Sequence, residues 1–255
     1  MSGALQGKTI IVTGAGGGIG REACAVLARA GANVIVTDIA ADRGRETAAA
    51  ITGSGLSATF FPADLASESD IQALVNHALE QFGRLDGAYN NAGVEQCALP
   101  LHELTLEQWE RAIRIDLTSV FLCIKHQVIA MLKSGGGAIV NTASSLGQVA
   151  IANASEYIAA KHGVVGLTRA AAAEYARQGI RVNAVLPGIV LTPLISRLVA
   201  DPQFGSFFEK VKERHPIGRF GQPGEIGEAV KWLLSDAASF VNGSAMAVDG
   251  GYLAI

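Results

Sequence analysis

The stretch KTIIVTGAGGGIG, residues 8–20, joins an apolar run, a glycine-rich turn and the start of a helical pattern. The run at 8–13 has the uninterrupted apolar character of a strand buried on both faces. Gly14, Gly18 and Gly20 let the main chain turn closely and leave free N–H groups at the start of the helix. In this context the turn predicts a site for a dinucleotide pyrophosphate. The spacing is G-x-x-x-G-x-G, and a tight turn without a ligand is the alternative interpretation.

The alternation of strand and helix continues along the chain. After 8–13, strand-like runs follow at 33–38, 58–64, 85–93, 137–144, 180–188 and 245–251, and the helical patterns between them include 19–30, 68–82, 103–132 and a helix ending near 177. Seven such runs separated by helices predict an α/β fold of Rossmann type, with a doubly wound, seven-stranded parallel sheet covered by helices on both faces. No linker divides the chain, so we expect one domain over 1–255. The segment 189–222 interrupts the pattern and is predicted to be a substrate lid.

The composition limits the classes of protein to be considered. The chain has 255 residues, of which 49% are hydrophobic and 17% charged, with a net charge of −3. This balance suits a deep core and gives no reason to expect nucleic acid or a membrane as a partner. Cys24, Cys97 and Cys123 form no CxxC pair, so we expect reduced thiols and no metal site. Residues 1–25 show no signal-peptide pattern and no apolar run is long enough to span a membrane, which favours a cytoplasmic protein.

Acidic residues end the second and third strand-like runs. Asp38 lies eighteen residues after Gly20, where a carboxylate can accept hydrogen bonds from both hydroxyls of a ribose. It would repel a 2′-phosphate, and Gly16 and Gly17 supply no basic residue to bind one. We therefore expect NAD rather than NADP as the cofactor. Asp64 could bind the adenine amino group, and a helix cap is the alternative role for either aspartate.

Tyr157 and Lys161 lie four residues apart in YIAAK and therefore share one face of a helix. Removal of hydride from an alcohol requires a base for the hydroxyl proton. A free tyrosine ionises only near pH ~10, but an ammonium group one turn away and a positively charged nicotinamide ring would favour the phenolate. Ser144, thirteen residues before Tyr157, could donate a hydrogen bond to the substrate oxygen. The set predicts hydride transfer between a nicotinamide cofactor and an alcohol or ketone; a surface Tyr–Lys pair, and Ser145 in place of Ser144, are the alternatives.

Over essentially its whole length the chain resembles the short-chain dehydrogenases/reductases. TGAGGGIG at 13–20, NNAG at 90–93, Ser144, YIAAK at 157–161, LPGIVLT at 186–192 and VDGG at 248–251 follow the order of that family. The family spacing selects Ser144 over Ser145. The resemblance implies that Tyr157 is the acid–base group and that Lys161 also holds the nicotinamide ribose. It further implies that Thr192 holds the nicotinamide carboxamide and that Asn91 supports the adenine-ribose side.

The resemblance also implies a set of residues around the cofactor. We expect this set to comprise Gly14, Gly18, Ile19, Gly20, Asp38, Asp64, Leu65, Asn91, Ala92, Gly93, Tyr157, Lys161, Pro187, Gly188, Val190 and Thr192. One catalytic position departs from the family pattern, because Asp116 stands where the family usually has an asparagine. An ionised aspartate accepts hydrogen bonds but donates none. Asp116 therefore either keeps the family's water relay to Lys161 or alters it.

The substrate is the least determined part of the prediction. The chain is most similar to NAD-dependent dehydrogenases of cyclic alcohols and diols, including those of chlorinated cyclohexadiene diols, whereas a β-ketoacyl (3-oxoacyl-ACP) reductase using NADPH and a non-catalytic NAD-binding sensor are the alternatives. The walls are expected at 94–101, 146–155 and in the apolar side chains of the lid, which are Leu191, Leu194, Ile195, Leu198, Val199, Phe204, Phe207 and Phe208. The resemblance implies self-association as a homotetramer through 103–132, 155–177 and the tail 251–255.

Overall fold

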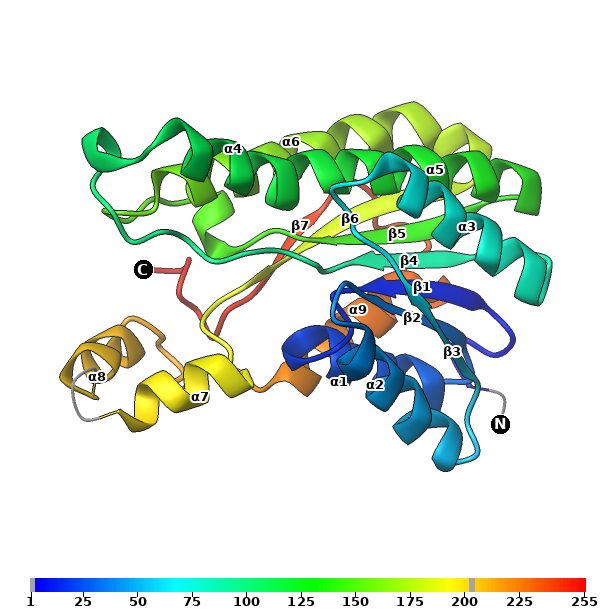
Figure 1. The fold of residues 1–255 in the computed structure, drawn as a ribbon, viewed down its shortest axis with the longest axis horizontal. Helices are drawn as coiled ribbons and strands as arrows, with labels where there is room; N and C mark the ends of the chain where they lie inside the picture. The colour runs from blue at the N-terminus through cyan, green and yellow to red at the C-terminus, as the bar shows by residue number, and fades with distance from the viewer. Residues whose placement is uncertain (1–2, 202–204) are drawn as a thin grey trace.

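A computed structural model describes residues 3–201 and 205–255, and within them the chain forms one seven-stranded parallel sheet with helices on both faces (Figure 1). The strand order is β3-β2-β1-β4-β5-β6-β7. The strands are β1 (Thr9–Thr13), β2 (Asn33–Asp38), β3 (Ala58–Pro62), β4 (Gly87–Asn90), β5 (Gly137–Thr142), β6 (Ile180–Pro187) and β7 (Ala245–Val248). The predicted Rossmann-type fold is confirmed. Because the order reverses between β1 and β4, a ligand cleft is expected outside the carboxyl ends of these strands.

The helices divide into two layers. One face of the sheet carries α1 (Gly18–Arg29), α2 (Ala41–Gly53) and α9 (Pro223–Leu234), and the other carries α3 (Glu68–Phe82), α4 (Leu106–Ile113), α5 (Ser119–Ser134) and α6 (Ser155–Tyr175) (Figure 1). Two further helices, α7 (Pro193–Ala200) and α8 (Gly205–Glu213), lie beside this body. The short 3₁₀ turns are η1 (Leu101–Glu103), η3 (Ser145–Gly147), η4 (Ala176–Gln178) and η5 (Asp236–Ala238).

The central strands are buried on both faces, as their apolar runs predict. Ile10 and Val12 of β1 belong to the core between the sheet and the α1, α2 and α9 layer. Ile11, between them, belongs to the core on the opposite face. This alternation is the period of two that a strand imposes on its side chains. The sheet is therefore packed on both faces, which holds in place the loops at the carboxyl ends of its strands. This side of the sheet is called the carboxyl edge below.

The helical stretch predicted at about 103–132 is confirmed as a continuous helix from Leu106 to Ser134, but the sequence did not predict the π-turn within it. Thr105 caps α4 in a capping box with Gln108, and a π-helical turn, η2 (Arg114–Thr118), separates α4 from α5. A π-turn inserts an extra residue and often marks a functional position. This turn contains Asp116, whose side chain is completely buried. Leu106–Ser134 is also the one described helical stretch long and apolar enough to cross a membrane, but half of its most apolar window is buried inside the protein.

Several predicted strands extend too far toward the carboxyl edge. The runs at 58–64, 85–93, 137–144 and 245–251 end as strands at Pro62, Asn90, Thr142 and Val248. The reason is visible after β4, where the N–H groups of Asn91 and Ala92 donate to the Thr13 hydroxyl at 2.9 and 3.0 Å instead of to a neighbouring strand. The last three residues of the NNAG motif, 91–93, therefore lie outside the sheet and belong to a loop at the site.

The segment 189–222, predicted as a lid, folds into α7 and α8. Its two ends are joined by main-chain hydrogen bonds, from Leu191 N to Gly221 O at 2.8 Å and from Gly221 N to Ile189 O at 2.9 Å. Phe208 is buried and packs edge-on against Phe207 and Phe220, so it stabilises the segment itself. The predicted lid residue Phe204 and the side chain of Leu194 lie outside the described part of the chain.

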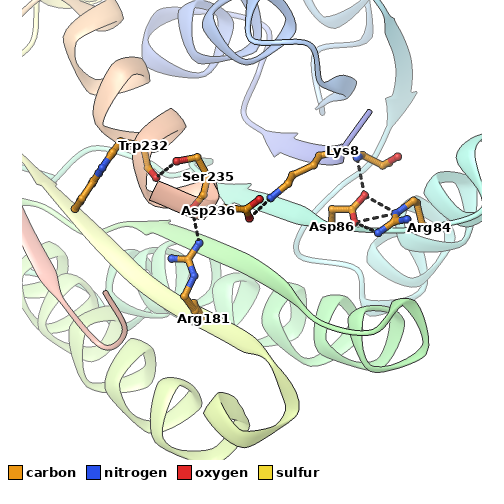
Figure 2. Close-up of polar contacts among 8 residues, drawn as sticks. Lys8, Arg84, Asp86, Arg181, Trp232, Ser235 and Asp236 are labelled. Atoms are coloured by element: carbon orange, nitrogen blue, oxygen red, sulfur yellow. Dashed lines mark hydrogen bonds and ion pairs between the residues drawn. The ribbon is translucent and has the colours of Figure 1, made fainter. Parts of the chain in front are cut away.

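The amino ends of the strands, here called the amino edge of the sheet, are held together by ion pairs and hydrogen bonds of charged side chains (Figure 2). Asp86 accepts hydrogen bonds from Thr9 N at 2.9 Å and from the Arg84 guanidinium at 2.5–2.9 Å. Lys8 pairs with Asp236 at 2.5 Å. Nearby, Arg181 donates to the carbonyl oxygen of Ser235 at 3.0 Å. These contacts join the starts of β1, β4 and β6 to the end of α9.

Candidate active site

The glycine-rich turn brings its main chain close to its neighbours. Gly14 and Gly18 have φ angles of +63° and +52°, in the left-handed region that favours glycine. A Cβ atom at Gly18 would lie 3.1 Å from Thr192 Cγ2. The turn and the start of α7 are therefore next to each other, as the predicted roles of these residues require. Ile19 is half-buried and packs on the core below the turn.

Asp38 joins the glycine-rich turn to the start of α2. Its Oδ2 atom accepts from Gly16 N and its Oδ1 atom from Ala40 N, both at 2.8 Å. Ala40 is the N-cap of α2 and no side chain caps this helix, so Asp38 forms a turn before α2 and not the helix cap. A carboxylate has about four acceptor positions. Two remain to accept hydrogen bonds from the hydroxyls of a ribose.

A cavity of about 710 Å³ lies between the glycine-rich turn and the start of α7. Its lining includes three arginines, Arg21, Arg43 and Arg197, together with Leu191, Pro193 and Ser196 from the predicted lid segment. Sequence reasoning looked for basic residues only in the turn and missed Arg43. A Cβ atom at Gly16 would lie 2.9 Å from Arg43 Cβ. The available signal was the position of Arg43 in the first turn of α2, five residues after Asp38.

Asp64 shapes the loop after β3. Its Oδ1 atom accepts from Ala66 N at 2.9 Å, and its own N–H donates to Asp70 Oδ2 at 3.1 Å. The side chain is exposed at the carboxyl edge, which leaves it accessible to a ligand. The cap of α3 is Ser67 and not Asp64. Leu65, next to it, packs against the core on the α3 side.

The NNAG motif connects β4 to both the glycine-rich turn and two of the predicted catalytic residues, Asp116 and Lys161. The Asn91 side chain donates to Thr13 O at 3.1 Å and to Gly14 O at 3.3 Å. Gly93 marks a close approach, because a Cβ atom there would lie 2.5 Å from Asp116 Oδ1 and 3.4 Å from Lys161 Nζ. Only glycine leaves this space free.

Tyr157 and Lys161 lie on one face of α6 at the carboxyl edge. The Lys161 ammonium nitrogen is 5.3 Å from the centre of the Tyr157 ring. Lys161 is buried, donates to Thr142 O at 3.3 Å and forms an ion pair with Asp116 Oδ1 at 3.2 Å. The buried positive charge therefore lies beside the phenol and is partly balanced by Asp116.

The two candidate serines have different environments. The Ser145 hydroxyl is buried and donates to Pro187 O at 3.0 Å. Ser144 is half-buried, and its hydroxyl oxygen accepts from Leu146 N at 3.1 Å. The Ser144 hydroxyl hydrogen is left to donate to a substrate oxygen. This geometry favours Ser144, in agreement with the family spacing.

Asp116 has an uneven environment. Its Oδ1 atom accepts from Val94 N at 3.0 Å in addition to the contact with Lys161. Its Oδ2 atom is buried and has no hydrogen-bond partner among residues 3–201 and 205–255. Burial raises the pKa of Asp116, while Lys161 and the Val94 N–H oppose that shift. Asp116 is therefore a carboxylate whose charge is costly where it lies.

The loop after β6 supplies the remaining predicted cofactor residues. Gly188 lies against His215, because a Cβ atom there would be 2.9 Å from His215 Nε2. Val190 is buried and forms a bridge with Gly221, and Thr192 caps α7 through its hydroxyl oxygen, which accepts from Ile195 N at 3.3 Å. The structure thus brings this loop to the glycine-rich turn and completes one side of the cleft.

The strand order reverses between β1 and β4, and both the glycine-rich turn and the Tyr–Lys pair lie at the carboxyl edge of the sheet. Together these features define a nicotinamide-dependent oxidoreductase. A family model described as Enoyl-(Acyl carrier protein) reductase matches residues 14–253. The chain belongs to the short-chain dehydrogenase/reductase family, as its motifs predicted.

Three similar proteins cover nearly the whole chain. A 2,5-dichloro-2,5-cyclohexadiene-1,4-diol dehydrogenase of Sphingobium indicum is 50% identical over 98% of this chain and 99% of the relative. A cyclohexanol dehydrogenase of an Acinetobacter species is 44% identical over 99% of this chain and 97% of the relative. A solved structure from Beutenbergia cavernae, assigned as an NAD(P) dependent gluconate 5-dehydrogenase with bound NADP at low occupancy, has a TM-score of 0.90 and 40% identity over 98% of both chains.

Proposed function

We propose that this protein is an NAD-dependent dehydrogenase of cyclic secondary alcohols or diols, which also reduces the corresponding ketones. The observation that carries the proposal is the Tyr157–Lys161 pair on one face of α6, with Lys161 donating to Thr142 O at the end of β5, two residues before Ser144. Names of relatives that act on a cyclic diol and on cyclohexanol support the substrate class.

The side chains of the site divide the chemistry among them. The bound cofactor supplies the acceptor or donor of hydride. Tyr157 takes the hydroxyl proton of an alcohol during oxidation and returns it to the oxygen of a ketone during reduction. The Lys161 ammonium places a positive charge 5.3 Å from the centre of the Tyr157 ring, beside the group that exchanges the proton. Ser144 donates a hydrogen bond to the substrate oxygen as charge develops on it.

The residues around the cleft suit a dinucleotide. The glycine-rich turn offers close main-chain approach and N–H groups at the start of α1, which attract a pyrophosphate. Asp38 has acceptor positions for the adenine ribose, and Lys161 would bind the nicotinamide ribose. Thr192, at the start of α7, faces the same turn and would hold the carboxamide.

Asp38 supports NAD, whereas Arg43 and the NADP-bound relative support NADP as the second candidate. A carboxylate repels a 2′-phosphate, while an arginine attracts it. We expect kcat/KM to be at least ~10-fold higher with NAD than with NADP, which corresponds to about 1.4 kcal/mol. Asp38→Asn should narrow this ratio and Arg43→Ala should widen it. A strong preference for NADP in the unaltered protein would reverse the assignment and favour the β-ketoacyl reductase alternative.

The substrate class is tested by measuring NADH formation with cyclohexanol, cyclohexane-1,4-diol, an aryl secondary alcohol and a linear secondary alcohol. We expect the cyclic compounds to give the highest kcat/KM, because 94–101, 146–155 and the segment 189–222 are the proposed walls, and apolar walls would exclude water from the bound ring. Tight NAD binding without turnover of any alcohol or ketone would favour a sensor over an enzyme.

The proposed homotetramer has support in the distribution of apolar side chains. The α4 and α5 helices expose five large hydrophobic side chains, Leu106, Trp109, Phe121, Ile129 and Leu132. A surface of this kind is often buried between subunits. Light scattering during size-exclusion chromatography should give four times the chain mass of 26.4 kDa. A monomeric mass would contradict the assembly without affecting the proposed chemistry.

A further inference from the structure

The catalytic helix carries a buried carboxylate that the proposed chemistry does not use. Glu156 immediately precedes Tyr157 in α6, and its side chain is completely buried. Its Oε1 atom accepts a hydrogen bond from Cys97 N at 2.6 Å. Its Oε2 atom has no hydrogen-bond partner within the described ranges 3–201 and 205–255. A buried carboxylate with one partnerless oxygen is costly, so the short hydrogen bond that Glu156 accepts from Cys97 N requires an explanation.

The loop that Glu156 contacts is one of the expected substrate walls. Cys97 lies in the segment 94–100, between β4 and α4. The next residue, Ala98, has a φ of +57°, and Asn153, three residues before Glu156, has a φ of +63°. These are the two non-glycine residues with positive φ in the described chain. A backbone conformation of this kind persists where the surrounding structure holds it in place. The hydrogen bond of Glu156 joins the residue before Ala98 to the residue three after Asn153.

The same loop is held at a second point by the other buried carboxylate of the site. Asp116 Oδ1 accepts from Val94 N at 3.0 Å, while Glu156 Oε1 accepts from Cys97 N. Two main-chain N–H groups of one short loop therefore bind carboxylates on two different helices. The first carboxylate also contacts Lys161, and the second neighbours Tyr157 in the chain.

The Cys97 side chain fits a wall and not a reactive group. Burial and the neighbouring Glu156 carboxylate raise the pKa of the Cys97 thiol. A thiol held in its protonated form is a poor nucleophile. The cluster of Glu156 and Cys97 is thus better suited to fixing a surface than to chemistry.

We propose that Glu156 is a positioning residue that fixes the 94–100 wall relative to the Tyr157 hydroxyl. The inference rests on the proposed function, because it assigns this wall to the bound alcohol. Without the hydrogen bond, Ala98 is free to leave its left-handed conformation and the loop moves away from the catalytic helix. A ring substrate then loses the surface that orients its carbinol carbon, which affects substrate binding more than the chemical step.

The test compares Glu156→Ala with Glu156→Gln, which keeps an acceptor oxygen and nearly the same volume. We expect Glu156→Ala to raise the KM for cyclohexane-1,4-diol at least ~10-fold, to change kcat less than ~3-fold, and to leave the KM for NAD unchanged. Glu156→Gln should restore the KM to within ~2-fold of the unaltered protein. Thr168→Val is the matched control, because it removes another buried hydrogen bond of α6, the one accepted from Asn141 at 2.9 Å, away from this loop.

A second substitution separates positioning from general stability. Glycine accepts positive φ without strain, so adding Ala98→Gly to Glu156→Ala should recover at least half of the lost affinity for the diol. Hydrogen exchange over 94–101 should be at least ~10-fold faster in Glu156→Ala and unchanged in Thr168→Val. If Glu156→Ala does not fold, Glu156→Asp takes its place, since the shorter side chain withdraws the acceptor.

The outcomes separate the two proposals. An unchanged KM for the diol with unchanged exchange over 94–101 would overturn the role of Glu156, and so would a Glu156→Gln protein as impaired as Glu156→Ala. Absence of turnover by the unaltered protein would instead overturn the proposed function. The exchange measurement needs no substrate and would still decide whether Glu156 holds the loop.

Discussion

The amino and carboxyl edges of the sheet differ in how completely their buried or partly buried carboxylates are paired. At the amino edge, both carboxylate oxygens of Asp86 have partners, and Lys8 pairs with Asp236 (Figure 2). At the carboxyl edge, Asp116 and Glu156 are fully buried and each has one oxygen without a hydrogen-bond partner in the described chain. The first arrangement stabilises the fold at little cost. The second costs stability, and we propose that it is retained for its effect on Lys161, Tyr157 and the segment 94–100.

The site at the carboxyl edge depends on the stability that the amino edge contributes. A buried, incompletely paired carboxylate can be kept only if the surrounding structure is stable enough to hold it. The layers of helices on both faces of the sheet and the ion pairs at its amino edge supply that stability. We therefore expect substitutions at the carboxyl edge to change rate and pH dependence, and substitutions at the amino edge to change stability.

The largest effect is expected from Tyr157→Phe. Loss of the hydroxyl removes the group that exchanges a proton with the substrate, so kcat should fall by about 10²–10⁴-fold. The variant should still bind NAD, as measured by the quenching of protein fluorescence. Tyr175→Phe, at the last residue of the same helix, is the matched control and should keep its activity. Equal activity of the two variants would remove Tyr157 from the chemistry.

Substitution of the adjacent residues Ser144 and Ser145 should distinguish a catalytic role from a structural one. Ser144→Ala should lower kcat by about 10²–10³-fold, as expected for loss of a donor to developing negative charge, with little change in thermal unfolding. Ser145→Ala should keep most of the activity and lower the free energy of unfolding by about 1 kcal/mol, because its hydroxyl donates to Pro187 O. Steady-state kinetics and thermal unfolding of both variants check this. The reverse pattern would exchange the two roles.

Asp116→Asn should shift the pH dependence of oxidation with only a few-fold change in maximal rate. The ionised carboxylate offsets part of the positive charge of Lys161 beside Tyr157, so its removal should move the rise of oxidation activity to lower pH. Because burial raises the pKa of Asp116, its charge is also lost as the pH falls. The profiles of the two proteins should therefore converge at acidic pH. Superimposable profiles at all pH values would exclude Asp116 from the proton path.

The smallest effect on catalysis is expected at the amino edge. Asp86→Asn loses the charge that pairs with Arg84 and weakens the contact with Thr9 N, which should lower the free energy of unfolding by about 1–3 kcal/mol. Thermal unfolding should begin several degrees lower, while kcat/KM below the transition stays unchanged. A loss of kcat/KM comparable to that of Ser144→Ala would show that the two edges are not independent.

The sequence predicted the parts of this protein that depend on local patterns. The bounds of β2 at 33–38 and of α3 at 68–82 agree with the apolar periods that predicted them. The glycine-rich turn and the Tyr–Lys spacing correctly indicated the family. Asp38 was assigned correctly to the end of β2, and the structure adds its contacts with Gly16 and Ala40.

The errors occur where contacts from distant parts of the chain decide the local structure. The region 103–132 was correctly predicted as helical, but its pattern gives no sign of the π-turn at Arg114–Thr118, where Asp116 is buried beside Lys161. The position of Arg43 five residues after Asp38 is a weak signal, and the packing of α2 against the glycine-rich turn brings Arg43 to the cavity. Glu156 looks like an ordinary polar residue at a helix start until the loop containing Cys97 covers it.

The sequence by itself determined the order of strands and helices, the family and the chemical groups available for hydride transfer, because these follow from residue spacing along a regular backbone. Only the tertiary structure decided which serine keeps a free donor, which carboxylates lose contact with water and which loop they hold. The physical reason is that burial and hydrogen bonding are properties of the space around a side chain, and that space is built here by segments as far apart in sequence as Cys97 and Glu156.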